Sequence, residues 1–315
     1  MIPMLQPSFF AARFAALATV ISLAACGACN CNLPAFNGSP GAVVAGGLAL
    51  PGGAVLPAAT PPPSTLSCNQ GAGSIPLGAA LAPFVVLAGT TVTNTGATVV
   101  GYAAGAVTGS HNDDLIGVSP GTSVVGFYPP GAITDGPSAI YAVGAGYTNT
   151  PAVPLAAENA LTTAFNTAAG LAPTATFPGG QDLAQASVVG HPVGTLPPGV
   201  YTSASTLAIA SGNLTLDAGG NSQAVFVFQM GSALTTTLNG SAGGNVILAG
   251  GAEACNIYWQ VGSSAVLGGA SFYGNVLALT AVTLTSSTQF TGRALAHDGA
   301  VTISTASLIT NPGGS

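Results

Sequence analysis

The sequence predicts a mostly β fold in which short strands stack as the coils of a parallel β-solenoid. Three observations lead to this fold class: apolar and polar residues alternate, glycine-rich turns recur, and similar units return at a fixed interval. The units Trp259–Val261, Leu277–Leu279 and Leu295–His297 are spaced 18 residues apart. About 18 residues suffice for three short strands and their corners. Stacking then buries the apolar face that one coil cannot bury alone.

One segment departs from the β pattern and is predicted to be a helix, from Pro154 to Ala169. A proline stands at its start, Glu158 lies in the first turns, and Gly170 follows its end. Its apolar residues recur at helical spacing, so we expect one stripe of the helix to pack against the solenoid. These residues are Ala157, Leu161, Ala164, Phe165 and Ala168.

The low charge of the chain limits its possible partners. Only 3% of the 315 residues are charged, none is lysine, and the two arginines are Arg13 and Arg293. Binding of phosphate backbones needs many basic side chains, so nucleic acid is excluded as a partner. No stretch beyond the N-terminal region stays apolar for the length that a membrane-spanning helix requires.

The N-terminal region predicts export. Arg13 precedes an apolar run from Phe14 to Ala25, so residues 1–25 are interpreted as a signal peptide. The run ends in Leu23-Ala24-Ala25-Cys26, which resembles the bacterial lipobox, and Cys26 is the predicted lipidation site. The alternative is an ordinary secretory signal in which Cys26 is incidental. Either way we expect an exported bacterial protein, extracellular or on the cell surface, with membrane attachment if Cys26 is lipidated.

Two further segments follow the signal peptide. Residues 26–74 are rich in Pro, Gly and Ala and predict a tether, and residues 75–315 form the predicted solenoid domain. An oxidising compartment permits a disulfide between Cys68 and Cys255, but their spacing does not establish it. No His lies at ligand spacing from the cysteines, so neither a metal site nor a cofactor is expected.

A series of strings in a fixed order resembles the microbial ice-binding-protein family. The resemblance covers about Ile75 to Pro312, and residues 102–112 look like an inserted loop relative to the family pattern. The strings that carry it are Phe84–Ala88, Thr91–Gly96, Ile116–Gly121, Pro198–Tyr201, Ala224–Gln229, Asn256–Gly262 and Gly292–Ala296. The resemblance implies a discontinuous right-handed β-solenoid of triangular section with the helix alongside, in which the N-terminal coil stacks on the C-terminal one. It also implies that the partner is an ice crystal surface, and we expect a monomer.

The repeats also predict which side chains would face ice. Strands starting at Thr91, Ala281 and Ala300 are equivalent in spacing, so their valines (Val92, Val282 and Val301) are expected to point inward. Alternation then places two columns outward. The first column is Thr93, Thr283 and Thr302, and the second is Thr95, Thr285 and Ser304. Rungs about 4.7–4.9 Å apart would order hydroxyl and methyl groups in an array that matches ordered water.

Two other functions remain as alternatives. Outward threonines keep any β-solenoid soluble, so the domain could be an adhesive or structural module of the cell surface without ice activity. Some β-helices are enzymes, but polysaccharide cleavage needs clustered carboxylates with a metal or base, and no triad or metal cluster is evident in the sequence. We therefore expect no catalysis. His297 is interpreted as a wall or cap residue, and Arg293 as a partner of a buried acid or of backbone carbonyls. His111, next to Asn112, Asp113 and Asp114, could bind a cation but is better explained as part of a polar loop.

Overall fold

The computed structural model of the chain describes residues 68, 70–101, 114–143, 147–237, 243–285, 288–304 and 307–313. All of these belong to the compact unit Pro61–Ser315. The predicted signal peptide, Cys26, most of the predicted tether and the predicted inserted loop 102–112 lie outside the described residues. No described helix is long and apolar enough to cross a membrane.

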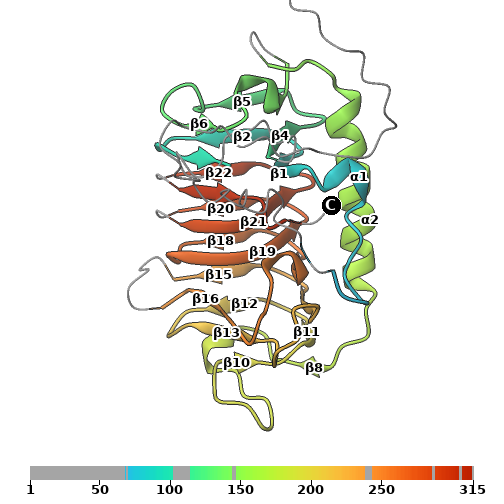
Figure 1. Cartoon of the computed structure of the whole chain (residues 1–315), viewed down its shortest axis with the longest axis vertical. Helices are drawn as coiled ribbons and strands as arrows, with labels where there is room; N and C mark the ends of the chain where they lie inside the picture. Colours follow the sequence, from blue (N-terminus) through green and yellow to red (C-terminus); the bar gives the residue numbers. More distant parts are fainter. Residues whose placement is uncertain are drawn as a thin grey trace, which may run out of the picture. The chain divides into compact units, whose positions relative to one another are not determined.

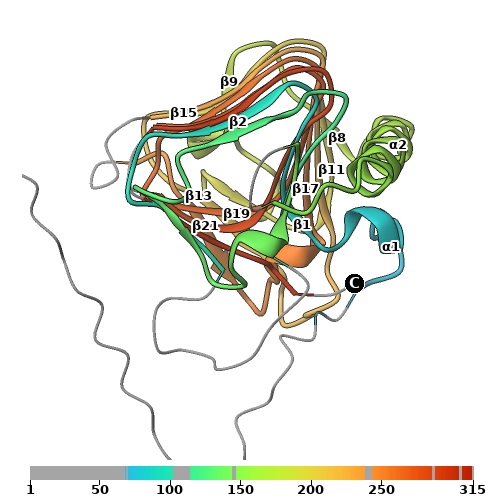
Figure 2. The ribbon, with the colours of Figure 1, turned by 90° about the horizontal axis from the view of Figure 1, so that it is seen from above.

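The described residues form a β-solenoid with three sides, which Figure 2 shows as a triangle when seen from above. Every strand pair in its sheets is parallel. One side, here called the threonine face, is a sheet of eight strands. In stacking order its strands are β9 (Gln181–Asp182), β12 (Leu207–Ile209), β15 (Leu234–Thr236), β18 (Ala265–Leu267), β20 (Val282–Leu284), β22 (Val301–Ile303), β2 (Thr91–Asn94) and β5 (Ser123–Val125).

The second side, here called the helix face, lies beneath the long helix (Figure 2). Two of its strands, β19 and β21, run on around a corner into the third face, and Gly274 in β19 has a φ of 113° there. The helix-face strands are β8 (Ala175–Thr176), β11 (Gly199–Ser203), β14 (Phe226–Met230), β17 (Ile257–Val261), β19 (Ser271–Ala278), β21 (Gln289–Ala296), β1 (Phe84–Ala88), β4 (Leu115–Val118) and β7 (Ile140–Tyr141). The third face adds β10 (Thr195–Leu196), β13 (Leu214–Asp217), β16 (Val246–Ala249), β23 (Leu308–Thr310), β3 (Val99–Val100) and β6 (Ala132–Ile133).

The order of the coils in the stack differs from their order in the chain, and this discontinuity was predicted. The first coil of the domain, β1 to β3, pairs with the last, β21 to β23, on all three sides. The coil β4 to β6 then lies beyond it (Figure 1). On the helix face, β7 pairs with β4 and ends the stack in this direction. Strands β8, β9 and β10 end the stack in the other direction.

One predicted repeat is wrong by a single residue. Leu277 pairs with Leu295 at the predicted spacing of 18, but its partner in β17 is Gln260, and Trp259 pairs with Val276. The cause is a shorter corner, because residues 268–270 join β18 to β19 whereas residues 285–288 join β20 to β21. His297 therefore occupies the position of Leu279 and not that of Val261.

The interior combines a stack of aromatic rings with a buried cation. The rings of Tyr201, Phe228 and Trp259 lie on successive coils, with centroids 5.4 and 4.1 Å apart. Arg293 is almost fully buried, and its Nε and Nη2 donate to the Ala82 carbonyl at 3.0 and 2.7 Å. Its Nη1 donates to Oδ1 of Asn275 at 2.9 Å. Arg293 thus binds a backbone carbonyl, one of the two roles predicted for it.

The long helix α2 (Ala152–Ala169) covers the helix face, and the shorter α1 (Gly78–Leu81) packs beside it (Figure 1). The predicted apolar stripe is buried, except that Phe165 is only half-buried. Glu158 lies in the second turn of α2, within the first turns as predicted, and it is buried, with only 6% of its surface exposed. Three short 3-10 turns complete the described fold: η1 (Pro137–Ala139), η2 (Leu183–Gln185) and η3 (Ala254–Asn256).

A disulfide joins Cys68 to Cys255, which answers the pairing left open by the sequence. Next to it, Ser74 donates to Oδ1 of Asn256 at 2.9 Å. The described end of the predicted tether is therefore attached to η3 of the solenoid.

Candidate functional site

The candidate site is the outward side of the threonine face, where the strand register aligns one side chain from each coil. Thr93 pairs with Thr302, and Thr302 pairs with Thr283, so the first predicted column occupies three consecutive coils. The same register continues the column in both directions. From one end to the other, its members are Asp182, Ala208, Thr235, Val266, Thr283, Thr302, Thr93 and Val125.

Alternation along each strand fixes the direction of these side chains. The valines that precede them, Val92, Val282 and Val301, are fully buried, as predicted. Thr93, Thr283 and Thr302 are half-buried by their neighbours and reach the surface. Strands β20 and β22 therefore alternate buried, half-buried and buried residues, as expected for a sheet with one face toward solvent.

The two predicted columns differ in what their hydroxyls contact. In the second column, Thr95 Oγ1 donates to the Ser304 carbonyl at 3.0 Å, and Thr285 Oγ1 donates to the Leu267 carbonyl at 3.3 Å. The hydroxyls of Thr93, Thr283 and Thr302 make no hydrogen bond to another described residue. The first column therefore offers hydroxyls to solvent, whereas much of the second column fastens the end of each strand to the coil beside it.

The threonine face carries a single ionisable side chain in its central column, Asp182 of β9. Its carboxylate accepts hydrogen bonds from the backbone N–H groups of Ala210 and Ser211 at 3.0 and 2.8 Å and from the Ser211 hydroxyl at 2.6 Å. Burial alone would raise the pKa of Asp182, but these hydrogen bonds outweigh it and lower the pKa below its usual value. The charged carboxylate of Asp182 thus lies on the end strand of the sheet, where hydrogen bonds from the protein satisfy it.

The sequence reasoning missed two members of this surface, Thr235 and Thr237. Thr235 lies in the first column, and Thr237 donates to the Ala210 carbonyl at 2.6 Å, as second-column residues do. Their coil was not recognised because β15 pairs with β18 over a distance of 31 residues, Leu234 with Ala265, and not over 18. The Thr-Thr-Thr sequence at 235–237 was the only available signal.

One group of side chains resembles a catalytic triad in its contacts. His297 Nε2 lies 2.7 Å from Thr162 Oγ1, and His297 Nδ1 lies 2.5 Å from Asp298 Oδ1. The Thr162 hydroxyl also donates to the Glu158 carbonyl at 3.0 Å, as helical threonines do, so the helix backbone already engages this hydroxyl. The group therefore links α2 to the corner between β21 and β22, which agrees with the wall role predicted for His297.

The described cysteines and acids contain one cluster with the geometry of metal ligands, formed by Cys68, Glu253 and Cys255. Both sulfur atoms belong to the disulfide, and a disulfide sulfur lacks the thiolate charge that binds metal. Of the predicted His111 to Asp114 cluster, only Asp114 is described, and it is buried.

These features define a class of protein: a β-solenoid with a helix on one side and, on another, a threonine-bearing sheet that no described element covers. The ice-binding-like family model matches residues 86–309. An ice-binding protein of Nostoc sp. (strain HG1) is 39% identical over 244 residues, which are 77% of each chain. The chain belongs to the ice-binding-like family.

Solved structures of ice-binding proteins share the fold. One from an Antarctic biological consortium is 38% identical with a TM-score of 0.59, covering 77% of this chain and 94% of that one. Another, from the Antarctic ascomycete Antarctomyces psychrotrophicus, is 28% identical with a TM-score of 0.58, covering 77% of this chain and 100% of that one.

Proposed function

We propose that this chain binds ice through the threonine face, with Thr93, Thr283, Thr302 and Thr235 as its central contacts. The observation that carries the proposal is their register, which places four threonines of one column on a sheet that no described element covers. Family membership and the ice-binding relatives support the same function.

The chemistry of the column suits ordered water. Parallel strands repeat at about 4.7–4.9 Å, so methyl and hydroxyl groups recur at a fixed interval along the stack. The methyl groups favour caged water beside them, and the hydroxyls without a protein partner hydrogen-bond to it. Side chains held by a rigid sheet lose little entropy on contact with a crystal.

The second column supports this array. Thr95, Thr285 and Thr237 tie the ends of their strands to the neighbouring coil, and their methyl groups and exposed edges widen the face. Ser304 is exposed in the same column. We propose that these residues contact ice at the margin and chiefly keep the strands aligned.

Thermal hysteresis and ice-recrystallisation assays on the purified protein test the function. We expect the folded chain to halt crystal growth below the melting point and to slow recrystallisation, and the same chain unfolded to do neither. A folded chain without effect in both assays would contradict ice binding.

Export is the second part of the proposal. We infer that residues 1–25 direct the chain out of the cell and that Cys26 carries a lipid, so that the domain acts on ice outside a bacterial cell. Detergent phase partitioning of the exported protein tests this: the wild type should enter the detergent phase and a Cys26→Ala variant the aqueous phase. Equal partitioning of the two would leave an ordinary secretory signal as the explanation.

A further inference from the structure

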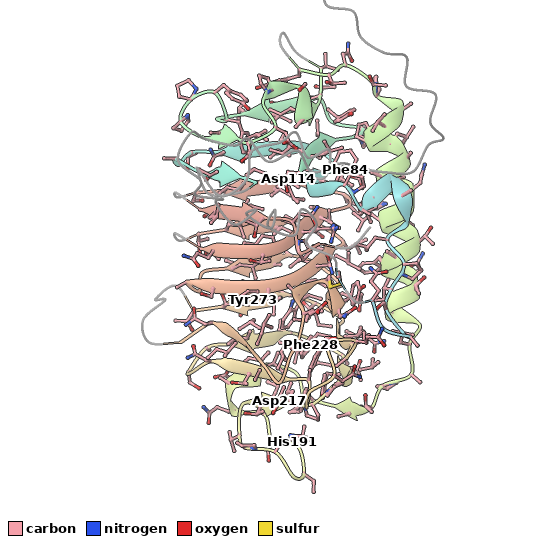
Figure 3. The ribbon with its side chains drawn as sticks, viewed as in Figure 1. Phe84, Asp114, His191, Asp217, Phe228 and Tyr273 are labelled. Atoms are coloured by element: carbon pink, nitrogen blue, oxygen red, sulfur yellow. A yellow bond between two sulfur atoms is a disulfide. The ribbon has the colours of Figure 1, made fainter. Side chains whose placement is uncertain are left out.

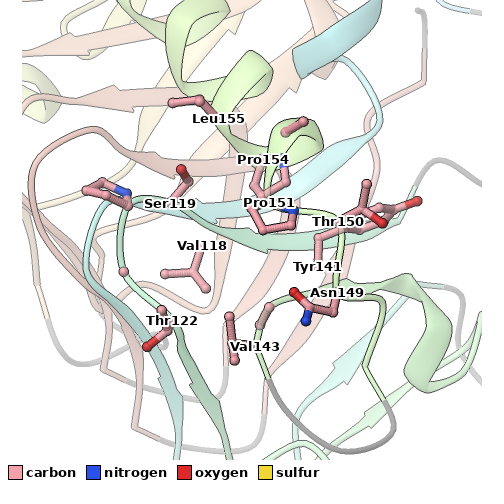
Figure 4. Close-up of a pocket in the computed structure, with 14 residues that line it drawn as sticks. Val118, Ser119, Thr122, Tyr141, Val143, Asn149, Thr150, Pro151, Pro154 and Leu155 are labelled. Carbon is pink, nitrogen blue, oxygen red and sulfur yellow. The ribbon is translucent and has the colours of Figure 1, made fainter.

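The two ends of the solenoid carry complementary apolar features that the ice-binding proposal does not use. At the end formed by β4, β5 and β7 there is a pocket of about 470 Å³ (Figure 4). The pocket lies between the β4–β5 corner and the start of α2, and most of its lining is apolar. Its wall includes Val118, Tyr141, Val143, Pro151, Pro154 and Leu155.

The rim of this pocket leaves large apolar side chains in water. Val143 is 55% exposed and Leu155 is 51% exposed, although both belong to a region with a well-packed core beneath it. No charged residue lines the pocket. An exposed apolar concavity of this kind commonly marks a contact site, because removal of its apolar walls and rim from water is favourable.

The opposite end carries an apolar projection, the loop 186–194 between η2 and β10. Figure 3 shows its His191 at the extremity of the described domain. Val189 is 99% exposed and Val193 is 60% exposed. Valine side chains with this much exposed surface are unfavourable in water, and their burial in a contact would be favourable.

The projection is also held in one conformation. His191 N donates to the Val188 carbonyl at 3.0 Å, and Gly190 has a φ of 85°, so residues 188–191 form a turn with Val189 at its tip. Gly194 N donates to the Ala186 carbonyl at 2.8 Å and closes the base of the loop. A preformed apolar tip loses little entropy on insertion.

We propose that the loop 186–194 of one molecule inserts Val189 into the pocket at the opposite end of a second copy of this chain. The proposal departs from the monomer expected from the sequence. It is favoured over an unrelated partner because projection and pocket occur on the same chain, at opposite ends of one stack, with neither carrying a carboxylate or a lysine or arginine. Such a contact joins unlike surfaces and so leaves a pocket free at one end and a loop free at the other.

The consequence is a linear assembly that leaves the threonine face uncovered. Neither the pocket nor the loop includes a residue of the eight-stranded sheet's central column. A chain with only 3% charged residues has little electrostatic repulsion to keep its ends apart. The contact is small, so we expect it to form at micromolar to millimolar concentrations.

Sedimentation of the purified full chain over a concentration series tests the proposal. We expect the weight-average mass to rise at least about twofold between roughly 5 and 500 µM, a range suited to small interfaces. Val189→Asp and Leu155→Asp should each remain monomeric. Ile247→Asp, at a similarly exposed position on the third face, should assemble as the wild type does.

Mixing the two defective variants gives the sharpest result. Val189→Asp keeps an intact pocket and Leu155→Asp keeps an intact loop, so an equimolar mixture should form dimers and nothing larger. Circular dichroism establishes that both variants are folded, and both sites are exposed. A wild type that stays monomeric, or a mixture that stays monomeric while the wild type assembles, would overturn the proposal, whatever the ice assays show.

Discussion

The helix face and the threonine face are built on the same coils but meet different surroundings. Strands β14 and β17 on the helix face are buried along their whole length, whereas β20 and β22 alternate between buried and half-buried residues. In the outward column of the helix face, Leu277 and Leu295 are fully buried, and Gln229 and Gln260 lie buried in the same column, with Gln229 Nε2 donating to the Ala168 carbonyl of α2 at 2.7 Å. The central column of the threonine face holds threonine at four of its eight positions.

Because the coils are shared, the outward side chains determine whether a side is covered by the helix or faces solvent. Leucine at outward positions exposes enough apolar surface to hold a helix, and α2 supplies the cover. Threonine buries too little to hold a cover, yet its β-branched side chain suits a strand. Among the described residues, this side is left without a cover and in contact with solvent.

The largest effect is expected from placing a charge inside the shared interior. Val282→Asp should prevent folding or destabilise the domain by more than about 4 kcal/mol, because it buries an unpaired carboxylate. Chemical unfolding followed by circular dichroism measures the loss. Thr283→Asp, the outward neighbour on the same strand, is the matched control and should change stability by less than about 1 kcal/mol. Similar losses in both variants would mean that the threonine face is not open.

A smaller effect is expected where α2 buries an acid against the helix face. Burial, with a lesser contribution from the Asp298 carboxylate, raises the pKa of Glu158 to about 8 from a usual 4.5. The folded state therefore keeps a proton that the unfolded state loses, and stability should fall as the pH rises from about 4.5 to 8, by at most about 1.4 kcal/mol per pH unit.

Glu158→Gln should remove this part of the pH dependence and stabilise the protein at pH 8. Urea unfolding at pH 5, 6.5 and 8 provides the comparison. If the stability of Glu158→Gln and of the wild type changes with pH in the same way, the predicted effect of burial on Glu158 is wrong.

The smallest effects should separate the two columns of the threonine face. Thr95→Val loses the hydrogen bond to the Ser304 carbonyl and should cost about 1 kcal/mol of stability. Thr93→Val loses no such bond and should stay within about 0.5 kcal/mol of the wild type. Differential scanning calorimetry measures both. Equal losses of stability in Thr95→Val and Thr93→Val would contradict the inference that the Thr95 hydroxyl stabilises the sheet and the Thr93 hydroxyl does not.

The sequence predicted the regular parts of this molecule well. Coils of equal length revealed the columns at Thr283 and Thr302, and helical spacing revealed α2, because both patterns are local. Thr235 was missed because its coil is longer, and the burial of Glu158 was missed because a helical carboxylate is usually solvated. The pocket beside Leu155 is lined by residues 118–155, and Val189 lies at the tip of the short loop 186–194; neither segment has a periodic pattern from which its exposure could be predicted.

We propose that the threonine face, and no other side, contacts ice. Thermal hysteresis of Thr283→Arg and Thr215→Arg tests it directly, because both are half-buried outward threonines on strands paired on both sides, one on the threonine face and one on the third face. We predict that Thr283→Arg loses roughly fivefold or more of the activity through lost surface complementarity, while Thr215→Arg keeps it. Retained activity in Thr283→Arg, or an equal loss in both folded variants, would contradict the account.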